Sequence, residues 1–424
     1  MITVPFVYFS FLAFFFYRSS RRIDLAVYIS LIYAVSGFFS IFLDVYKLRS
    51  SDTASYEITL LPTIVYCLSL TACIYPIYAF SKAYHGRISA LKSDSPLRTI
   101  ALLGFVFAVF SIIMSMGSVT TVLKSDIGEL RNDMYRGIEQ ETWMTSLPSA
   151  IRVPIALLNH VFGAPWVFIF LAFYALFVQK MPVKYGLMFL TVSFLGPVGG
   201  IAGADRSKVT YWVLSLIGCY ILFRSYIPHK QRRKYFSFGL ILLTLMFAYL
   251  ALVTDSRFGE VDYGPELSGT QGGIVWYLGE PFVNFCFFYD NFTSPLINPG
   301  IVLPFITRTF FGGYGQTVDW QAYLSFVTNV RIGVFYTFLG AIKIGLGKIG
   351  MYIYLLILSV GGYWIVRPTK RQTLSLVNIY LYFLIATVPI LGLFGHYYSS
   401  ATKTFCVTLF FLFTHYVSRN RNKK

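Results

Sequence analysis

Charged side chains are scarce in this chain of 424 residues, of which Asp, Glu, Lys and Arg together make up 12%. Hydrophobic residues make up 56%, and the mean hydropathy is +0.64. This composition excludes a water-soluble fold, and the length excludes a simple membrane anchor. We therefore predict an all-α integral membrane protein that forms one polytopic domain over residues 1–424.

Residues that form disulfides, hold metals or bind phosphate are few or badly spaced. Of the five cysteines, only Cys286 falls in a segment that we expect outside the membrane, so no disulfide between outer loops is expected. His and Cys are too scattered for a zinc site, no Asp-x-Asp pair occurs, and no cytoplasmic glycine-rich phosphate loop is present. We therefore expect neither a metal nor a cofactor.

What the sequence does contain is about eleven long apolar stretches. A helix needs roughly 20 apolar residues to cross the hydrocarbon core of a bilayer. This length predicts spans near residues 2–17, 23–43, 60–81, 99–117, 153–178, 185–203, 208–225, 236–253, 349–366, 374–394 and 401–418.

Basic residues are distributed unequally between the segments that connect these spans. When the segments are assigned alternately to the two sides of a membrane, one side holds 21 of the 35 basic residues and only two acidic ones, Asp24 and Asp94. The other side holds 14 basic and 16 acidic residues. The positive-inside rule then places the N-terminus outside and the C-terminus in the cytoplasm. The net charge of +17 therefore orients the helices against anionic membrane lipids, and nucleic acid is not an expected partner.

The longest outer segment, residues 255–347, precedes the ninth span. Its stretches 274–289 and 301–311 are apolar and aromatic and are separated by glycines. A long soluble loop does not tolerate such sequence, so we expect short interfacial helices on or in the bilayer surface. Residues 334–347 continue the pattern, which predicts another interfacial helix that leads into the ninth span.

Four arginines of the outer segments suit a phosphate-bearing ligand. Arg206 follows a turn with three glycines and begins a membrane helix, where free N–H groups and the helix dipole also favour an anion. Arg257 follows the eighth span, and Arg308 and Arg331 lie farther along the same segment. A guanidinium binds phosphate with two hydrogen bonds and keeps its charge in a partly dry site, so these four are the predicted phosphate-binding residues. The alternatives are an ion pair of Arg206 with Asp205, contact with lipid headgroups, and ordinary loop arginines.

Three residues of the outer segments are candidate general bases. His396 lies in the short turn between the last two spans, and its ordinary pKa suits proton transfer. Glu280 lies in an apolar stretch, where burial favours a raised pKa. Asp319 stands beside Trp320, and Asp290 is a weaker fourth candidate. For each of them a purely structural role is the alternative.

The layout of the chain resembles the O-antigen polymerase family, also called oligosaccharide repeat unit polymerases. The resemblance covers most of the length and rests on the eleven spans, the long outer segment, the glycine-rich turn before Arg206 and the run Tyr336-Thr337-Phe338-Leu339-Gly340. It implies a bacterial inner-membrane glycosyltransferase that moves a growing glycan from polyprenyl diphosphate onto a new lipid-linked repeat unit. The implied product is O-antigen or capsular polysaccharide, and the implied partners are the lipid-linked oligosaccharide, membrane lipids, a chain-length regulator and a flippase.

Two other functions remain open from the sequence. A flippase or transporter for lipid-linked oligosaccharides is expected to carry charged residues inside its spans and inverted repeats, whereas the span interiors here are almost free of charge. An O-antigen ligase-like glycosyltransferase uses the same donor with a different acceptor, and the sequence does not separate it from a polymerase.

Overall fold

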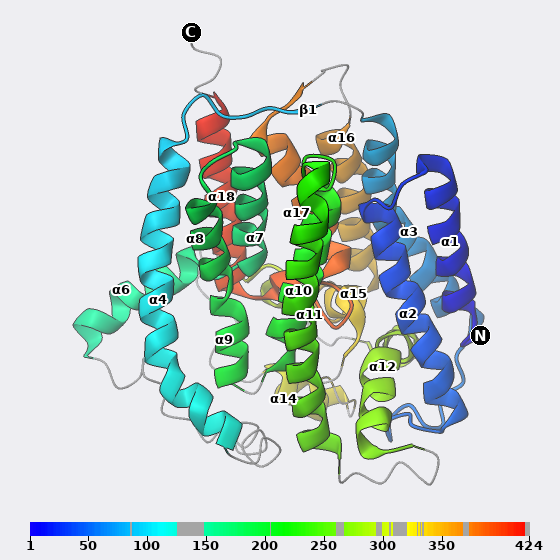
Figure 1. Cartoon of the computed structure of the whole chain (residues 1–424). Coiled ribbons are helices and arrows are strands. Elements are labelled where there is room, and N and C mark those ends of the chain that lie inside the picture. Colours follow the sequence, from blue (N-terminus) through cyan, green and yellow to red (C-terminus); the bar gives the residue numbers. More distant parts are fainter. Residues whose placement is uncertain are drawn as a thin grey trace. The chain divides into compact units, whose positions relative to one another are not determined.

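The computed structural model describes residues 1–84, 87–124, 148–203, 205–259, 267–293, 299–304, 307, 320–328, 330, 332, 335–367 and 373–419. Within these ranges, the side chains of residues 123–124, 257–258 and 320–323 are not described. The chain divides into two compact units (Figure 1): unit 1 contains residues 1–87 and 272–404, and unit 2 contains residues 88–271 and 405–424. The described secondary structure is helical except for two strands of two residues, β1 (Arg87–Ile88) and β2 (Thr373–Leu374).

Unit 1 is built from an N-terminal group of helices and a later group that packs against it. Its elements are α1 (Val4–Ser20), α2 (Leu25–Val45), α3 (Leu60–Ala83), α12 (Gly269–Asn291), η2 (Pro299–Ile301), α14 (Trp320–Thr328), α15 (Thr337–Leu356), η3 (Ile357–Gly361), α16 (Gly362–Val366), α17 (Leu376–Ile390) and η4 (Tyr397–Ser399). Helix α3 contacts α1, α2, α15, α16 and α17, so it is the central helix of this unit.

The core of unit 1 is largely aromatic. The ring of Phe9 on α1 packs against Tyr33 of α2 and Tyr66 of α3, with centroid distances of 5.6 and 6.1 Å. Tyr66 in turn packs against Phe282 of α12 at 5.0 Å. The hydroxyl of Tyr33 donates a hydrogen bond of 3.0 Å to the carbonyl of Pro389 in α17. Buried aromatic rings and the hydrogen bond of Tyr33 thus join the two sequence segments of the unit.

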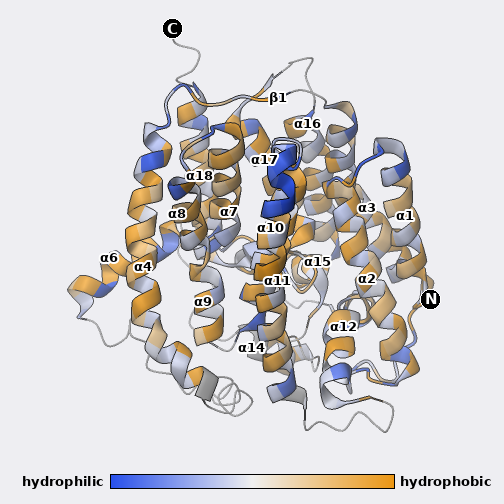
Figure 2. Cartoon of the chain, in the orientation of Figure 1, coloured by the Kyte–Doolittle hydropathy of each residue, from blue (hydrophilic) through white to orange (hydrophobic). Residues whose placement is uncertain are grey.

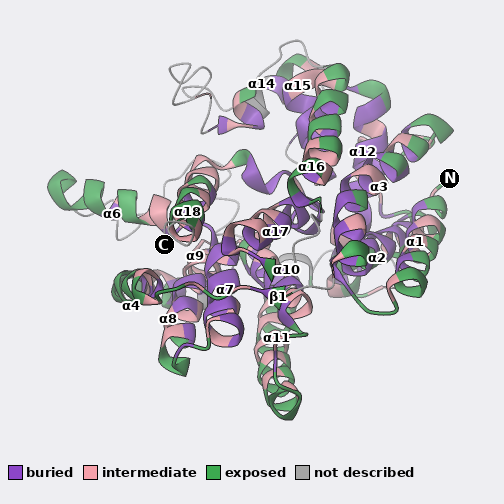
Figure 3. Cartoon of the chain, turned by 90° about the horizontal axis from the view of Figure 1, so that it is seen from above, coloured by how far each residue is buried: buried purple, intermediate pink, exposed green. Residues whose placement is uncertain are grey.

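Unit 2 is assembled around one fully apolar helix. Its elements are α4 (Ser95–Lys124), α6 (Ser149–Val161), α7 (Pro165–Phe173), η1 (Tyr174–Val178), α8 (Val183–Ser193), α9 (Leu195–Ala202), α10 (Arg206–Phe223), α11 (His229–Phe258) and most of α18 (Ala401–Arg419). Every residue from Trp166 to Ala172 in α7 is buried. By contrast, only 6% of the apolar stretch of α11 is buried, and Figure 3 shows this helix as a mixture of exposed and intermediate residues. Such an exposed apolar helix is suited to a lipid environment.

Six segments among the described residues are long and apolar enough to cross a membrane, which supports a multi-pass membrane protein. They are Leu25–Val45, Leu60–Ala83, Ser95–Val122, Val183–Ala202, His229–Ser256 and Thr337–Val366. Helix α6 and the α7–η1 helix meet at a bend of 55° and make a seventh if they form one span. Figure 2 shows the apolar lengths of these helices and the hydrophilic start of α11. The other expected spans are helical but are not among the six, so eleven spans and their orientation stay predictions.

The long segment before the ninth span differs from the expected short interfacial helices. Helix α12 is one continuous helix of 23 residues, and its side chains from Phe282 to Cys286 are buried. The residues Thr337–Gly345 at the start of α15 are buried as well. Gly347, at φ +72°, then breaks the helix before its exposed second half. Most of the described apolar residues of α12 and of Thr337–Gly345 therefore pack against protein, whereas Phe326 of α14 is 87% exposed.

Candidate functional site

The predicted site residues are divided between the two units. Arg206 and Arg257 belong to unit 2, whereas Glu280 and His396 belong to unit 1. The backbone of Arg257 is in the last turn of α11, but its side chain is not described. The predicted base Asp319 and the predicted phosphate ligands Arg308 and Arg331 lie outside the described residues.

Arg206 is a buried arginine at the first residue of α10, with 5% of its surface exposed. Its Nη1 donates a hydrogen bond of 3.0 Å to the hydroxyl oxygen of Thr254 on α11. That hydroxyl donates in turn to the carbonyl of Leu250 at 2.7 Å. Tyr249 of α11 lies within electrostatic range of both Asp205 and Arg206, and its buried hydroxyl has no hydrogen-bond partner among the described residues. The guanidinium is thus oriented by the C-terminal turns of α11.

Asp205 begins α10 as its N-cap. One of its carboxylate oxygens accepts from the backbone N–H of Ser207 at 2.9 Å and from the hydroxyl of Ser207 at 2.6 Å. Its other oxygen lies 4.0 Å from Nζ of Lys208, at the limit of an ion pair. Because Asp205 caps its own helix, the first turn of α10 is fixed while Arg206 points to α11. This geometry holds a positive charge at a helix N-terminus, as the sequence suggested.

Glu280 is buried in α12 where that helix contacts α2, and it has no exposed surface. A Cβ atom on the preceding Gly279 would come within 2.7 Å of the carbonyl oxygen of Phe39 in α2, so only glycine allows this approach. Pro281 follows and cannot donate a backbone hydrogen bond within the helix. The hydroxyls of Ser36 and Ser40 in α2 donate to the carbonyls of Leu278 and Gly279, at 2.8 and 2.7 Å. The carboxylate therefore lies where hydrogen bonds from α2 hold the backbone of α12 and where Pro281 interrupts the hydrogen bonding of the helix.

The neighbours of Glu280 along α12 face the segment that leads into α15. Asn284 and Phe288 follow Glu280 at intervals of four residues, so the three share one helix face. The amide of Asn284 donates a hydrogen bond of 2.8 Å to the carbonyl of Phe335. Thr337, two residues later, has a buried hydroxyl with no hydrogen-bond partner in the described chain. The face of α12 that carries Glu280 thus makes a polar contact with the backbone of Phe335.

His396 is buried in the turn between α17 and α18, with 5% of its surface exposed. Burial lowers the pKa of its imidazole to about 4; a hydrogen bond to the backbone of Val302 opposes this shift and the charge of Lys403 adds to it. The buried Nε2 has no hydrogen-bond partner within the described ranges. At neutral pH the ring is therefore uncharged, with one nitrogen available as a proton acceptor.

Aromatic contacts join the segments that carry Glu280 and His396. Tyr277, one turn before Glu280, packs against Phe335 and Phe394, with ring centroids 4.4 and 4.9 Å apart. Phe394 lies two residues before His396 in the same turn. The backbone N–H of Phe338 also donates to the carbonyl of Gly392 at 2.7 Å. Helix α12, the start of α15 and the His396 turn therefore meet in unit 1.

Protonation of His396 should destabilise unit 1 in acid. Because its pKa is near 4 in the folded state and 6.5 ordinarily, the unfolded chain binds the proton more tightly between these values. The stabilisation is complete above pH 6.5 and falls as pH decreases to about 4, by roughly 3 kcal/mol. Thermal unfolding of the detergent-solubilised protein between pH 4 and 8 measures this loss. His396→Gln should flatten the profile, and an equal pH dependence in both proteins would contradict the assignment.

Lys343 is a buried lysine that sequence reasoning did not assign to the site. Its Nζ donates to the carbonyls of Phe288 and Phe292, the latter at 2.6 Å, at the C-terminal end of α12. It also lies 5.9 and 5.5 Å from the ring centroids of Tyr289 and Phe292. The Phe288 carbonyl also accepts from the backbone N–H of Phe292 at 3.1 Å, whereas the Phe292 carbonyl lies just beyond the end of α12, where the helix dipole favours a cation. Lys343 thus fixes the end of α12 against the first half of α15.

Lys343→Met should lower stability by about 3 kcal/mol, because two hydrogen bonds from the ammonium group are lost and the Phe292 carbonyl loses this donor. Lys348→Met is the matched control, since Lys348 is exposed on the same helix and lies 4.5 Å from the ring of Tyr289. The control should cost no more than about 1 kcal/mol. Thermal melting in detergent compares the two variants, and equal losses would remove the capping role.

No family model, curated protein or solved structure matches this chain. The functional argument therefore rests on the residues of the chain itself.

Several of the residues that shape these sites carried no recognisable sequence signal. Thr254 and Asn284 are ordinary polar residues of helices, and only the fold shows that one orients Arg206 and the other holds Phe335. Lys343 lies close to the run at 336–340, but its hydrogen-bond partners are about fifty residues away in the sequence. The four-residue spacing of Glu280 and Asn284 was the one available hint.

Proposed function

We propose that this protein polymerises polyprenyl-diphosphate-linked oligosaccharide repeat units at the outer face of a bacterial inner membrane. The observation that carries the proposal is the burial of two acid–base groups, Glu280 and His396, in unit 1 of a chain that has few charges. Ionisable groups buried in a membrane protein are costly and are commonly retained for function. The resemblance in layout to O-antigen polymerases supplies the substrate class.

The reaction needs a group that accepts a proton and a positive charge that stabilises the leaving group. A hydroxyl oxygen of the acceptor sugar attacks the anomeric carbon of the donor glycan, and the bond from that carbon to the diphosphate breaks. Glu280 or His396 accepts the hydroxyl proton. Arg206 stabilises the negative charge that develops on the departing polyprenyl diphosphate. Arg257, Arg308 and Arg331 remain proposed diphosphate ligands, and Asp319 remains a proposed base.

A lipid-linked oligosaccharide flippase is a second candidate, and one observation favours it. Glu280 and Lys343 are both buried inside the helical unit rather than at its exposed ends, with 0% and 2% of their surfaces exposed. Buried ionisable residues of this kind also occur along transport pathways. The charge of Lys343, however, is held by the end of α12, which explains its burial without transport. We therefore prefer the polymerase.

Deletion of the gene in its host, followed by electrophoresis of the surface glycan, separates the two candidates. A polymerase predicts loss of the long ladder while a single repeat unit remains attached at the surface. A flippase predicts loss of all surface glycan with accumulation of the lipid-linked unit inside the cell. An unchanged ladder would contradict both.

A further inference from the structure

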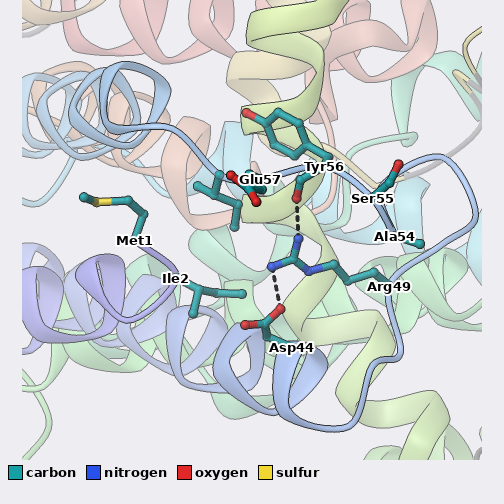
Figure 4. Close-up of a pocket in the computed structure, with 9 residues that line it drawn as sticks. Met1, Ile2, Asp44, Arg49, Ala54, Ser55, Tyr56 and Glu57 are labelled. Carbon is teal, nitrogen blue, oxygen red and sulfur yellow. Dashed lines mark hydrogen bonds and ion pairs between the residues drawn. The ribbon is translucent and has the colours of Figure 1, made fainter.

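A polar pocket lies at the end of unit 1 where α2 and α3 are joined, apart from Glu280 and His396. Its volume is about 400 Å³ (Figure 4). The residues that line it are Met1, Ile2, Asp44, Arg49, Ala54, Ser55, Tyr56, Glu57 and Ile58. The volume is at the lower end of the range for small-molecule sites. The charge asymmetry of the sequence assigns this loop to the outer face.

The loop that forms the pocket is held by side-chain hydrogen bonds. Arg49 donates through Nη2 to a carboxylate oxygen of Asp44 at 2.5 Å and through Nη1 to the carbonyl of Tyr56 at 2.6 Å. The hydroxyls of Tyr56 and Thr59 both donate to one carboxylate oxygen of Asp290, at 2.7 and 2.9 Å. The pocket is therefore built on a braced loop that is attached to the end of α12.

The charged groups of the pocket supply acceptors for hydroxyl groups. Both terminal nitrogens of Arg49 are engaged by Asp44 and the Tyr56 carbonyl, so its charge is compensated. Glu57 adds a second carboxylate, which is exposed, and 46% of the Asp44 side chain is exposed as well. The charged side chains of the pocket sum to a negative value. The α-ammonium group of Met1, which also lines the pocket, offsets this charge, and hydroxyl groups are attracted to the carboxylate oxygens.

The two sides of the pocket differ in polarity. Figure 4 shows Ile2 pointing toward the Asp44 and Arg49 pair, with Met1 beside it, while the carboxylate of Glu57 lies near the Tyr56 carbonyl. Apolar side chains next to hydroxyl acceptors match a sugar ring, which has C–H faces and a rim of hydroxyl groups. Charge-assisted hydrogen bonds from hydroxyls to carboxylates are among the stronger neutral-ligand contacts.

We propose that the pocket of Asp44, Arg49 and Glu57 binds an uncharged, hydroxyl-rich sugar residue. This inference rests on the proposed function. The pocket holds one sugar of the lipid-linked repeat unit at a subsite away from the reacting bond. The link through Asp290 places this subsite at the C-terminal end of α12. Glu280 lies ten residues earlier on that helix, which is ~15 Å along its axis. A glycan that occupies the pocket is thus held near the helix that carries the proposed base.

The test uses full-length protein in lipid nanodiscs and, as the probe, the single repeat unit released by mild acid from the host's own surface glycan. Saturation-transfer NMR should show binding to the wild type, and Glu57→Gln should weaken it about tenfold. Asp52→Asn is the matched control, because Asp52 is in the same loop but does not line the pocket, and it should bind like the wild type. Ser55→Trp, which fills the pocket, should also lose binding at an unchanged melting temperature.

Two results would overturn the proposal. One is equal binding by the wild type, Glu57→Gln and Ser55→Trp. The other is displacement of the oligosaccharide by inorganic pyrophosphate, which would make the pocket an anion site. These outcomes are distinct from failure of the proposed function. If gene deletion leaves the ladder unchanged while Glu57→Gln still loses binding, the sugar site is supported and the polymerase function is rejected. If deletion removes the ladder while Glu57→Gln binds normally, only the sugar site falls.

Discussion

Alanine in place of Arg206 is expected to reduce long surface glycan at least about 100-fold, because the guanidinium is the described charge best placed to stabilise a departing diphosphate. The side chain is 5% exposed and is held at the start of α10 by Thr254. Its removal leaves no other described cation in the same position. The measurement is the length distribution of surface glycan in a deletion strain that expresses the variant.

Two companion variants separate charge from folding. Arg206→Lys keeps the charge but loses the planar pair of donors, so it should recover only part of the ladder. Lys208→Ala removes a charge two residues away, where 44% of the side chain is exposed, and should leave the ladder intact. Membrane insertion and melting temperature should be unchanged in all three proteins. A normal ladder in Arg206→Ala would remove this residue from the mechanism.

Glutamine in place of Glu280 is expected to lower the rate of chain extension by about 100-fold or more, since the carboxylate can no longer accept a proton. The substitution preserves size and hydrogen-bonding capacity at a fully buried position. Its effect should therefore appear in the turnover rate more than in the binding of the lipid-linked substrate. Assays of the purified protein with lipid-linked repeat units measure both quantities.

Asn284→Ala is the control for a structural effect of that substitution. It removes the hydrogen bond to Phe335 on the same helix face and leaves the carboxylate in place. We expect a loss of stability of about 1 kcal/mol with a largely retained rate. If Glu280→Gln behaves like Asn284→Ala, Glu280 is a packing residue and His396 becomes the leading base.

The helices of this chain could be predicted from sequence because long apolar runs have few alternatives in a membrane. The structure has helices at each of the eleven expected positions, although only six or seven segments among the described residues have the length and apolarity of a span. The 55° bend between α6 and α7 divides the expected span at 153–178. Gly163 and Pro165 at that bend were its sequence signal.

The long segment before the ninth span could not be predicted as well, because its burial depends on partners that are distant in sequence. Its apolar stretches, separated by glycines, predicted short helices at the bilayer surface. The hydroxyls of Ser36 and Ser40 in α2 instead donate to α12 and allow it to pack inside unit 1. In the same way, Lys343 belongs to the predicted interfacial helix at 334–347. In the structure its Nζ donates instead to a backbone carbonyl at the end of α12.

The roles of the candidate site residues stay predictions from the sequence. Burial confirms that Arg206, Glu280 and His396 are unusual ionisable residues, but burial alone does not assign their roles. These three residues could be selected from the sequence because charged residues are scarce in this chain. Their orienting partners depend on tertiary contacts, which composition does not encode.

The most direct test of the account is extension of a defined substrate by the purified protein. The full-length chain is reconstituted in liposomes with the host's polyprenyl-diphosphate-linked repeat unit, and the products are separated by electrophoresis. The account predicts a ladder of glycans that contain multiple repeat units, and release of polyprenyl diphosphate in step with each added unit. Movement of the intact repeat unit across the bilayer without any increase in its length would contradict it.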